Sequence, residues 1–294
     1  MSRVETWVRS QGPWQRILVF LVVLALPWLP GFVLLSWLGN AFNISGATGI
    51  LSLVLLYAGF LWGLPRWGQR IHHWRKPFRH CGLIFQAQTV RDLAIALVIG
   101  VMGVFALFGL ETLLGWASPT QPSPLLYRFV VEGLAMALSV GFAEEMLFRG
   151  WVLAELEKNY SSTPSLIMSA LFFAGTHFIK PWAEIVRTFP QFFGLLALGL
   201  ALVWARRTQT PTLGRSPIRN LPAQGATRIG YPIGLHAGLI WGYYIVNVGG
   251  LSQYTGLVPE WVTGIDSNPL AGALGIILLG LIAAQFAKIA QPKA

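Results

Sequence analysis

Among the titratable or charged side chains inside apolar segments of the sequence, five could form one chemical site. Glu144, Glu145 and Arg149 share one such segment, and His177 and His236 lie in two later ones. A carboxylate in hydrocarbon costs at least ~3 kcal/mol, so its presence needs a partner or a function. Carboxylates and imidazoles are the side chains that most often move protons in hydrolysis. The sequence therefore predicts a polar site between apolar helices, with Glu144, His177 and His236 as candidate catalytic residues.

Helical geometry gives the two adjacent carboxylates different partners. Glu145 and Arg149 are four residues apart, so they lie on one helical face and can form an ion pair. Glu144 is rotated by about 140° from Arg149 at 100° per residue. We therefore predict a mainly structural ion pair between Glu145 and Arg149. Glu144 has no local cation and is the stronger candidate for chemistry.

The positions of the two histidines predict that they lie near Glu144. Glu144 and His177 are almost equally far along the chain from the turn at residues 159–164. At 1.5 Å per residue, both lie ~25 Å from that turn on antiparallel helices, and therefore at one depth. His236 points away from the face formed by Gly234 and Gly238, and we expect it to face a cavity in the bundle rather than lipid.

The composition is that of an integral membrane protein. Of 294 residues, 54% are hydrophobic and 11% are charged, against about 25% charged in soluble domains. The single cysteine, Cys81, excludes an intrachain disulfide and a cysteine-cluster metal site. The net charge of +10 comes from basic residues between apolar segments. This favours contact with a lipid bilayer over binding to nucleic acid.

The apolar segments predict an all-α, polytopic bundle of about eight transmembrane helices. A spanning helix needs about 20 mostly apolar residues, and no internal repeat or long hydrophilic linker divides the chain. Residues 1–294 are therefore predicted to form a single integral membrane domain. The predicted spans are roughly 17–38, 50–64, 90–115, 125–157, 164–180, 189–205, 231–249 and 269–288.

The positions of lysine and arginine predict the orientation. Basic residues concentrate near the N-terminus, in the loops 65–91 and 206–230, and near the C-terminus, including Arg215, Arg219 and Lys293. Cytoplasmic loops carry such an excess. The N- and C-termini are therefore predicted to be cytoplasmic, and which membrane holds the protein is left open.

Three motifs on separate apolar helices carry a family resemblance. They are Glu-Glu-x-x-x-Arg at Glu144 to Arg149, Phe-x-x-x-His at Phe173 to His177, and the later His236. Over about residues 125–249 the chain resembles the CPBP (Abi or CAAX protease) family of intramembrane proteases, which includes the type II CAAX prenyl endopeptidases.

The resemblance implies an endopeptidase that cleaves peptides or membrane proteins inside a membrane cavity open to the inner side. It implies that Glu144 is the general base for a water held with His177, and that His236 binds the developing oxyanion. Whether the substrates are prenylated stays open. So does the metal: Glu144, His177 and His236 could ligate zinc with a water in the fourth position, or activate water unaided.

One position departs from the family pattern. Family members usually have Asn or Asp four residues after the last histidine, whereas this chain has Ile240, which cannot donate a hydrogen bond. A catalytically impaired membrane scaffold is therefore the second hypothesis. A proton-coupled transporter, with Glu144 and His177 as a relay, is the third. Inverted repeats would favour it, but none is present.

Overall fold

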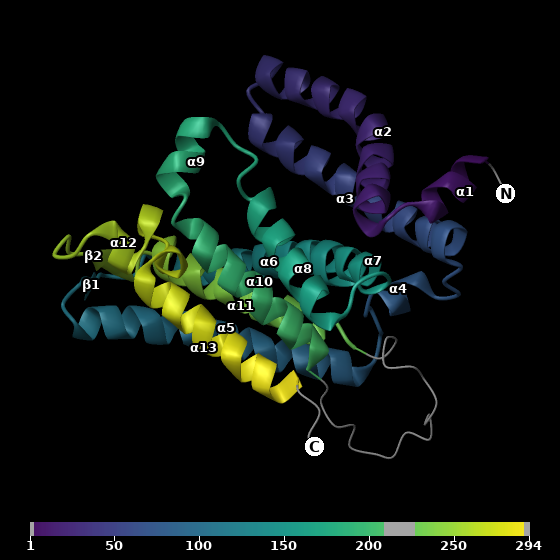
Figure 1. Ribbon diagram of the computed structural model, residues 1–294. Helices are drawn as coiled ribbons and strands as arrows, with labels where there is room; N and C mark the ends of the chain where they lie inside the picture. Colours follow the sequence, from purple (N-terminus) through teal and green to yellow (C-terminus); the bar gives the residue numbers. More distant parts are fainter. Residues whose placement is uncertain (1–2, 209–226, 291–294) are drawn as a thin grey trace.

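The computed structural model describes residues 3–208 and 227–290, and this part of the chain is almost entirely helical (Figure 1). Its only strands are β1 (Ala117–Pro119) and β2 (Ser252–Tyr254), which pair antiparallel. The all-α prediction is therefore confirmed for the described residues.

Each predicted span corresponds to a helix. The long helices are α2 (Pro13–Ala41), α3 (Ser45–His72), α5 (Ala87–Leu113), α6 (Leu126–Glu145) with its continuations η1 (Met146–Val152) and α7 (Leu153–Glu157), α8 (Ser162–Thr176), α10 (Gln191–Arg207), α11 (Gly230–Asn247) and α13 (Ala273–Ala290). The short helices are α1 (Arg3–Ser10), α4 (Pro77–His80), α9 (Trp182–Thr188), α12 (Glu260–Thr263), η3 (Ile265–Ser267) and η4 (Pro269–Ala271).

The predicted count of eight spans is not confirmed. Five helices of the described part are long and apolar enough to cross a membrane, or six if the bent pair α9 and α10 forms one span. Helix α8 has only 15 residues. Helix α11 has 18 residues but falls outside this set, and it carries His236 and several glycines. The predicted span 50–64 is too short, because α3 continues past Pro65 to a length of 28 residues.

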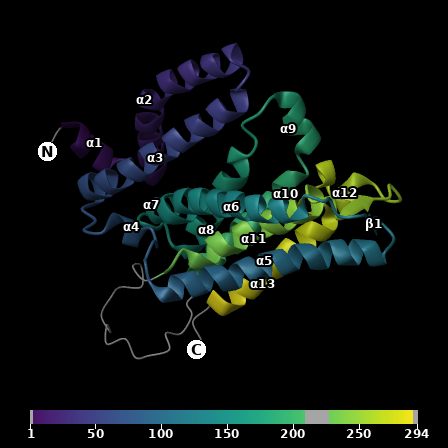
Figure 2. The same ribbon diagram turned by 180° about the vertical axis from the view of Figure 1, so that it is seen from behind.

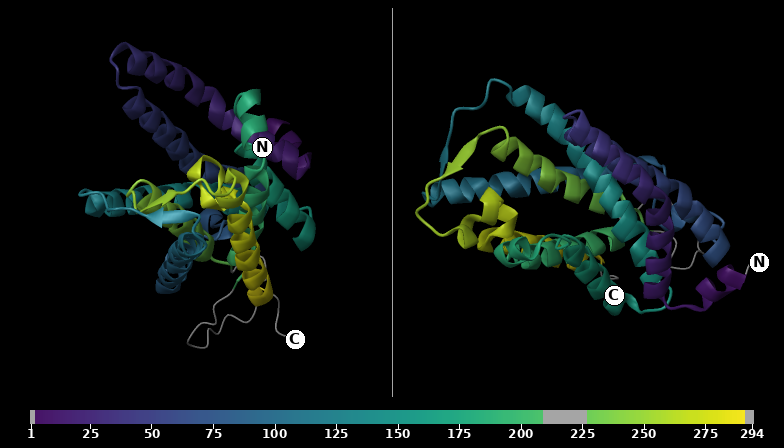
Figure 3. Two further views of the ribbon diagram at one scale, coloured as in Figure 1. Left: turned by 90° about the vertical axis from the view of Figure 1, so that its left-hand side faces the viewer. Right: turned by 90° about the horizontal axis from the view of Figure 1, so that it is seen from above.

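Helices α2 and α3 form a hairpin that projects from the rest of the bundle (Figures 1 and 3). Figure 1 also shows that α2 changes direction along its length, and Pro27 and Pro30 lie inside this helix. Such internal prolines kink helices because the ring clashes with the preceding turn. Most apolar side chains of α2 are exposed in the structure, as expected for a helix whose solvent is lipid.

Helix α11 packs closely along α5 through glycines (Figure 2). A Cβ atom added at Gly234 or Gly238 would overlap with a carbonyl oxygen of α5. A Cβ atom added at Gly100 of α5 would in turn lie 2.7 Å from the carbonyl oxygen of Leu235. Small residues let helix backbones approach in a membrane, where hydrophobicity alone does not drive helices together. The glycine face predicted from the sequence is therefore the contact with α5, and His236 points elsewhere.

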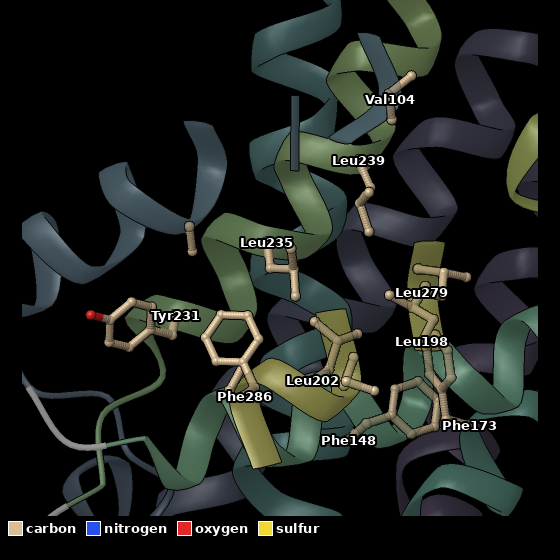
Figure 4. Packing of buried hydrophobic residues seen from close by; sticks show 14 of the residues in the cluster. Val104, Phe148, Phe173, Leu198, Leu202, Tyr231, Leu235, Leu239, Leu279 and Phe286 are labelled. Atoms are coloured by element: carbon tan, nitrogen blue, oxygen red, sulfur yellow. The ribbon is translucent and has the colours of Figure 1, made fainter. Parts of the chain in front are cut away.

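The main apolar core joins side chains from η1 and five helices, α5, α8, α10, α11 and α13 (Figure 4). Figure 4 shows Phe148 and Phe173 next to Leu198 and Leu202 of α10, with Leu235 and Leu239 of α11 farther along. The elements that carry Arg149 and His236, and α8, which His177 directly follows, are thus held by one packed cluster.

A second, polar cluster joins the N-terminal hairpin to the end of the α6–α7 rod. The fully buried Glu155 of α7 accepts hydrogen bonds from Arg16 of α2 at 3.0 Å and from Trp67 of α3 at 2.8 Å. His72 lies 2.5 Å from the same carboxylate. These segments belong to the side that the basic residues predict to be cytoplasmic, so the fold brings them together at one end.

The orientation of the termini stays a prediction. Strands β1 and β2 pair two loops, which follow the predicted spans 90–115 and 231–249, and the predicted topology places both loops on the side opposite the termini. Arg215, Arg219 and Lys293, which contributed to the charge argument, lie outside the described residues.

The close contact between α5 and α11 predicts a specific sensitivity to added volume. We expect Gly238→Leu to lower the folded yield in the membrane, because forcing extra atoms into a packed contact typically costs about 1–3 kcal/mol. Gly280→Leu is the matched control, since Gly280 on α13 has open space around its Cα. Detergent-solubilised monodisperse protein is the measurement, and equal yields for the two variants would contradict the assigned contact.

Candidate active site

Three of the predicted site residues converge on one point. Glu144 lies at the end of α6, His177 follows the last turn of α8, and His236 lies in the second turn of α11. Glu144 Oε2 is 4.0 Å from His177 Nε2 and 4.0 Å from His236 Nε2. This oxygen is buried and has no hydrogen-bond partner in the structure. The distances are too long for direct hydrogen bonds and leave room for one small bridging group.

The ring orientation of each histidine is fixed by its other nitrogen. His177 Nδ1 is 2.8 Å from the carbonyl oxygen of Phe173, and His236 Nδ1 is 2.9 Å from Glu145 Oε1. A carbonyl and a carboxylate accept hydrogen bonds, so both Nδ1 atoms carry the proton. In the neutral imidazole, both Nε2 atoms therefore direct a lone pair toward Glu144.

Glu145 forms the predicted ion pair and also an unpredicted contact. Its Oε1 accepts a hydrogen bond from Arg149 Nη1 at 2.9 Å, and both side chains are fully buried. The same oxygen accepts the hydrogen bond from His236 Nδ1. The contact joins residues 91 positions apart in the sequence, and no spacing argument could have found it. Glu145 thus links the buried cation to one histidine of the candidate site.

Besides Glu145, Arg149 contacts two further helices, α8 and α10. Its guanidinium lies 4.1 Å from the ring centroid of Phe173 in α8, and its Nη2 donates to the carbonyl oxygen of Gly199 in α10 at 3.3 Å. Cation–π contacts strengthen when both groups are desolvated. The Phe-x-x-x-His motif therefore serves the site twice, since Phe173 contacts Arg149 by its ring and His177 by its carbonyl oxygen.

The segment that carries Arg149 is a π-helix, where the sequence predicted a regular α-helix over 125–157. Its wider turns alter the backbone hydrogen bonds, and two arginines bond to carbonyl oxygens between η1 and α10. Arg149 of η1 donates to Gly199 of α10, and Arg206 of α10 donates to Gly150 of η1 at 3.2 Å. Arg206 is buried as well. These reciprocal contacts fix η1 against α10.

A cavity of about 290 Å³ borders the two histidines. His177 and His236 belong to its lining. Gln191 at the start of α10, Tyr243 near the end of α11, and Asn268 also line it. Sequence reasoning missed these three polar residues. The signal available was a polar side chain at the start of an apolar span, as at Gln191. Ile240 lines the same cavity, so the position of the usual family Asn or Asp faces it with an apolar side chain.

The donor set has the chemistry of a zinc site but not its spacing. Two imidazoles and one carboxylate are common zinc ligands. Ligand atoms about 2.0–2.1 Å from a tetrahedral zinc ion lie about 3.3–3.4 Å from one another. Here Glu144 Oε2 is 4.0 Å from the Nε2 atom of each histidine. Within residues 3–208 and 227–290, no group of three His, Cys, Asp or Glu is arranged to hold a metal ion. As they stand, these side chains do not fit zinc.

Cys81 takes no part in the site. Its side chain is fully buried in the second apolar cluster, beside Met146 and Trp151. Burial raises the pKa of the Cys81 thiol to about 12, so the reactive thiolate is scarce near neutral pH. A cysteine-nucleophile mechanism therefore has no support from this residue.

Comparison with known proteins agrees with the site motifs. Residues 126–214 match the family model described as type II CAAX prenyl endopeptidase Rce1-like. The match includes Glu144, Glu145, Arg149 and His177 but ends before His236. It confirms the resemblance predicted from the motifs and supports a protease of the CAAX endopeptidase type. Comparisons with curated proteins and with solved structures gave no match.

The buried ion pair predicts a large effect of removing its cation. We expect Arg149→Ala to destabilise the folded protein by about 3–5 kcal/mol, because Glu145 would be left buried beside only His236. Arg128→Ala is the matched control: Arg128 and Glu132 have the same spacing on α6 at 2.6 Å but are exposed, and such pairs contribute about 0–1 kcal/mol.

Thermal unfolding in detergent measures both variants. If Arg149→Ala is as stable as Arg128→Ala, the pair is not the structural element assigned here.

Proposed function

From the resemblance to the type II CAAX prenyl endopeptidases, we propose that this chain is an intramembrane endopeptidase that hydrolyses peptide bonds of membrane-associated substrates. The observation that carries the proposal is the position of Glu144 Oε2, buried without a partner and 4.0 Å from both histidine Nε2 atoms. Glu144 Oε2 and His177 Nε2 are two acceptors at a spacing that fits one bridging water molecule, which has two protons to donate.

In the proposed reaction, Glu144 is the general base. The water donates one proton toward Glu144 Oε2 and the other toward His177 Nε2, so its lone pair is directed at the scissile carbonyl carbon. As the new C–O bond forms, Glu144 takes the proton. It then delivers this proton to the amide nitrogen as the C–N bond breaks. General acid–base catalysis of this kind contributes about 10²- to 10⁴-fold.

His236 is the proposed oxyanion partner, in its protonated form. Its Nδ1–H is already bonded to Glu145, so only a proton on Nε2 lets it donate to the substrate oxygen. The Glu145 carboxylate would stabilise the resulting imidazolium, and Arg149 fixes that carboxylate. Glu145 and Arg149 are therefore positioning residues in this proposal.

Ile240 removes one donor from this arrangement. The loss of an oxyanion-hole donor typically costs about 10²- to 10³-fold in rate, so we propose a slow enzyme. The same residue favours the second candidate function, a membrane scaffold that binds substrates without cleaving them.

The basic segments support cytoplasmic N- and C-termini. The partners are a peptide or membrane-protein substrate and the lipid bilayer. The spacing at the site supports water activation without a resident zinc ion, and no step above requires one.

The mechanism predicts the effect of a minimal change at the base. Glu144→Gln keeps the shape of the side chain but cannot accept the proton, and we expect kcat for peptide cleavage to fall at least ~100-fold. Glu132→Gln on the exposed face of α6 is the matched control and should be unaffected. Cleavage of a peptide library by purified protein, followed by mass spectrometry, is the measurement. Undiminished cleavage by Glu144→Gln would refute the base assignment, and no cleavage by the unaltered chain would favour the scaffold.

The cofactor proposal predicts a metal content. Active protein purified without added metal should contain far less than one zinc per chain by elemental analysis, and a chelator should leave its cleavage rate unchanged. A content near one zinc per chain that is lost together in His177→Ala and His236→Ala would show that these side chains close around a metal.

A further inference from the structure

Helices α2 and α3 enclose an apolar groove of about 320 Å³ that is separate from the candidate active site. Its lining extends along α2 from Phe20 to Leu35 and along α3 from Ser52 to Trp62, and it shares no residue with the cavity beside the histidines. Its few polar groups lie on the lining residues Ser52, which is buried, and Trp28 and Trp62. The indole N–H of Trp28 already donates to the Ser52 carbonyl oxygen at 2.9 Å. The wall of the groove is therefore almost entirely apolar.

The groove exists because the two helices of the hairpin do not fill the space between them. Gly31 of α2 and Gly59 of α3 both line it, and a Cβ atom added at Gly31 would meet nothing within 4 Å. Pro27, a further lining residue, lies inside α2 and kinks such a helix. The hairpin projects from the rest of the bundle (Figures 1 and 3), and the lining residues Val23 and Trp62 are 58% and 64% exposed. The groove thus opens toward the bilayer.

The part of the groove on α3 is as long as one leaflet of a bilayer is thick. Ser52 and Trp62 are ten residues apart, which corresponds to about 15 Å of helix. The hydrocarbon core of a bilayer is about 30 Å thick, so one leaflet contributes about 15 Å. No charged residue lies between Arg16 and Arg66, and Trp favours the level of the headgroups. The groove therefore begins near the headgroups at Trp62 and extends one leaflet deep, as a single acyl chain does.

A cation lies on the ring that forms the Trp62 end of the groove. The guanidinium carbon of Arg66 is 3.6 Å from the centroid of the Trp62 ring, and Nη1 donates to the Trp62 carbonyl oxygen at 2.6 Å. In the part of the chain that the structure describes, no carboxylate forms an ion pair with Arg66. A guanidinium has five N–H donors, so several remain for a ligand. Arginine binds phosphate through two parallel hydrogen bonds.

We propose that the groove between α2 and α3 binds one acyl chain of an anionic phospholipid, with the phosphate of that lipid on Arg66. An apolar wall suits an acyl chain, because a peptide in the same place would leave its backbone groups without hydrogen bonds. The basic segment 65–80 favours a headgroup without a cation of its own. The bound lipid fills the space that the hairpin leaves open, and it stabilises the hairpin by binding to the folded state.

Native mass spectrometry of the full-length protein, stripped of lipid in detergent, tests the proposal with dioleoylphosphatidylglycerol as the probe. We expect one lipid per chain to bind more tightly than any other. Gly31→Phe fills the groove, and the affinity for this first lipid should fall at least ~10-fold because several buried CH₂ groups lose their contacts. Gly49→Phe is the matched control, since Gly49 lies in α3, has the same open space and does not line the groove. An equal loss in both variants, or no loss in Gly31→Phe, would overturn the inference.

A change at the cation tests the headgroup contact without touching the packing of the hairpin. We expect Arg66→Gln to weaken the same binding about 5-fold. Arg75→Gln removes the same charge from an exposed residue beyond the end of α3, and it should have little effect. If the two variants weaken binding equally, the headgroup responds only to the total charge of this segment and Arg66 is not its partner.

Two further probes distinguish the lipid from its parts. Dioleoylglycerol has the same chains without the phosphate, and it should bind about 5-fold more weakly than dioleoylphosphatidylglycerol and be insensitive to Arg66→Gln. Inorganic phosphate should not displace the bound lipid. Thermal unfolding adds an independent readout: the phospholipid should raise the Tm of the unaltered chain and of Gly49→Phe but not that of Gly31→Phe. Equal affinity for dioleoylglycerol, or displacement by phosphate alone, would contradict the proposed ligand.

Discussion

The site depends on one buried carboxylate that satisfies two partners at once. Glu145 accepts hydrogen bonds from Arg149 and from His236 through a single oxygen, and the side chains of Glu145 and Arg149 are fully buried. A buried guanidinium and a buried carboxylate are each costly alone. Together they require that η1, α8, α10 and α11 keep their relative positions. The orientation of His236 then follows from a contact that the fold has to keep for electrostatic reasons.

The glycine contact explains how a polar site fits among short helices. Gly234 and Gly238 place α11 almost against the backbone of α5, so α11 lies in the middle of the bundle with little contact with lipid. A helix in that position can carry an imidazole, and its length does not have to match the thickness of the bilayer. The same feature explains why α11 is not among the helices that qualify as spans by length and composition.

The sequence predicted those contacts whose distance follows from regular helix geometry within a short stretch of the chain. Glu144 and His177 meet because a hairpin with a short turn sets the depth of both from the rise per residue. Glu145 and Arg149 pair because four residues make about one helical turn. No helix geometry relates His236 to Glu145, which is 91 residues away in the sequence. Helix α3 was predicted too short, because its basic end continues as helix past Pro65. Gln191, Tyr243 and Asn268 carry no motif, and only packing brings them to one cavity.

The π-helical turn of η1 lies between two polar contacts on one continuous rod. Before it, Glu144 and Glu145 face the histidines, and after it Glu155 faces Arg16 and Trp67 of the N-terminal hairpin. A π-turn accommodates an extra residue relative to an α-helix, so it changes the angular register between these two faces. Removal of one residue between 146 and 152 would therefore do more than shorten the rod. It would remove the residue that the π-turn accommodates and let the segment become a regular α-helix, without the wider turns in which Arg149 reaches the carbonyl oxygen of Gly199.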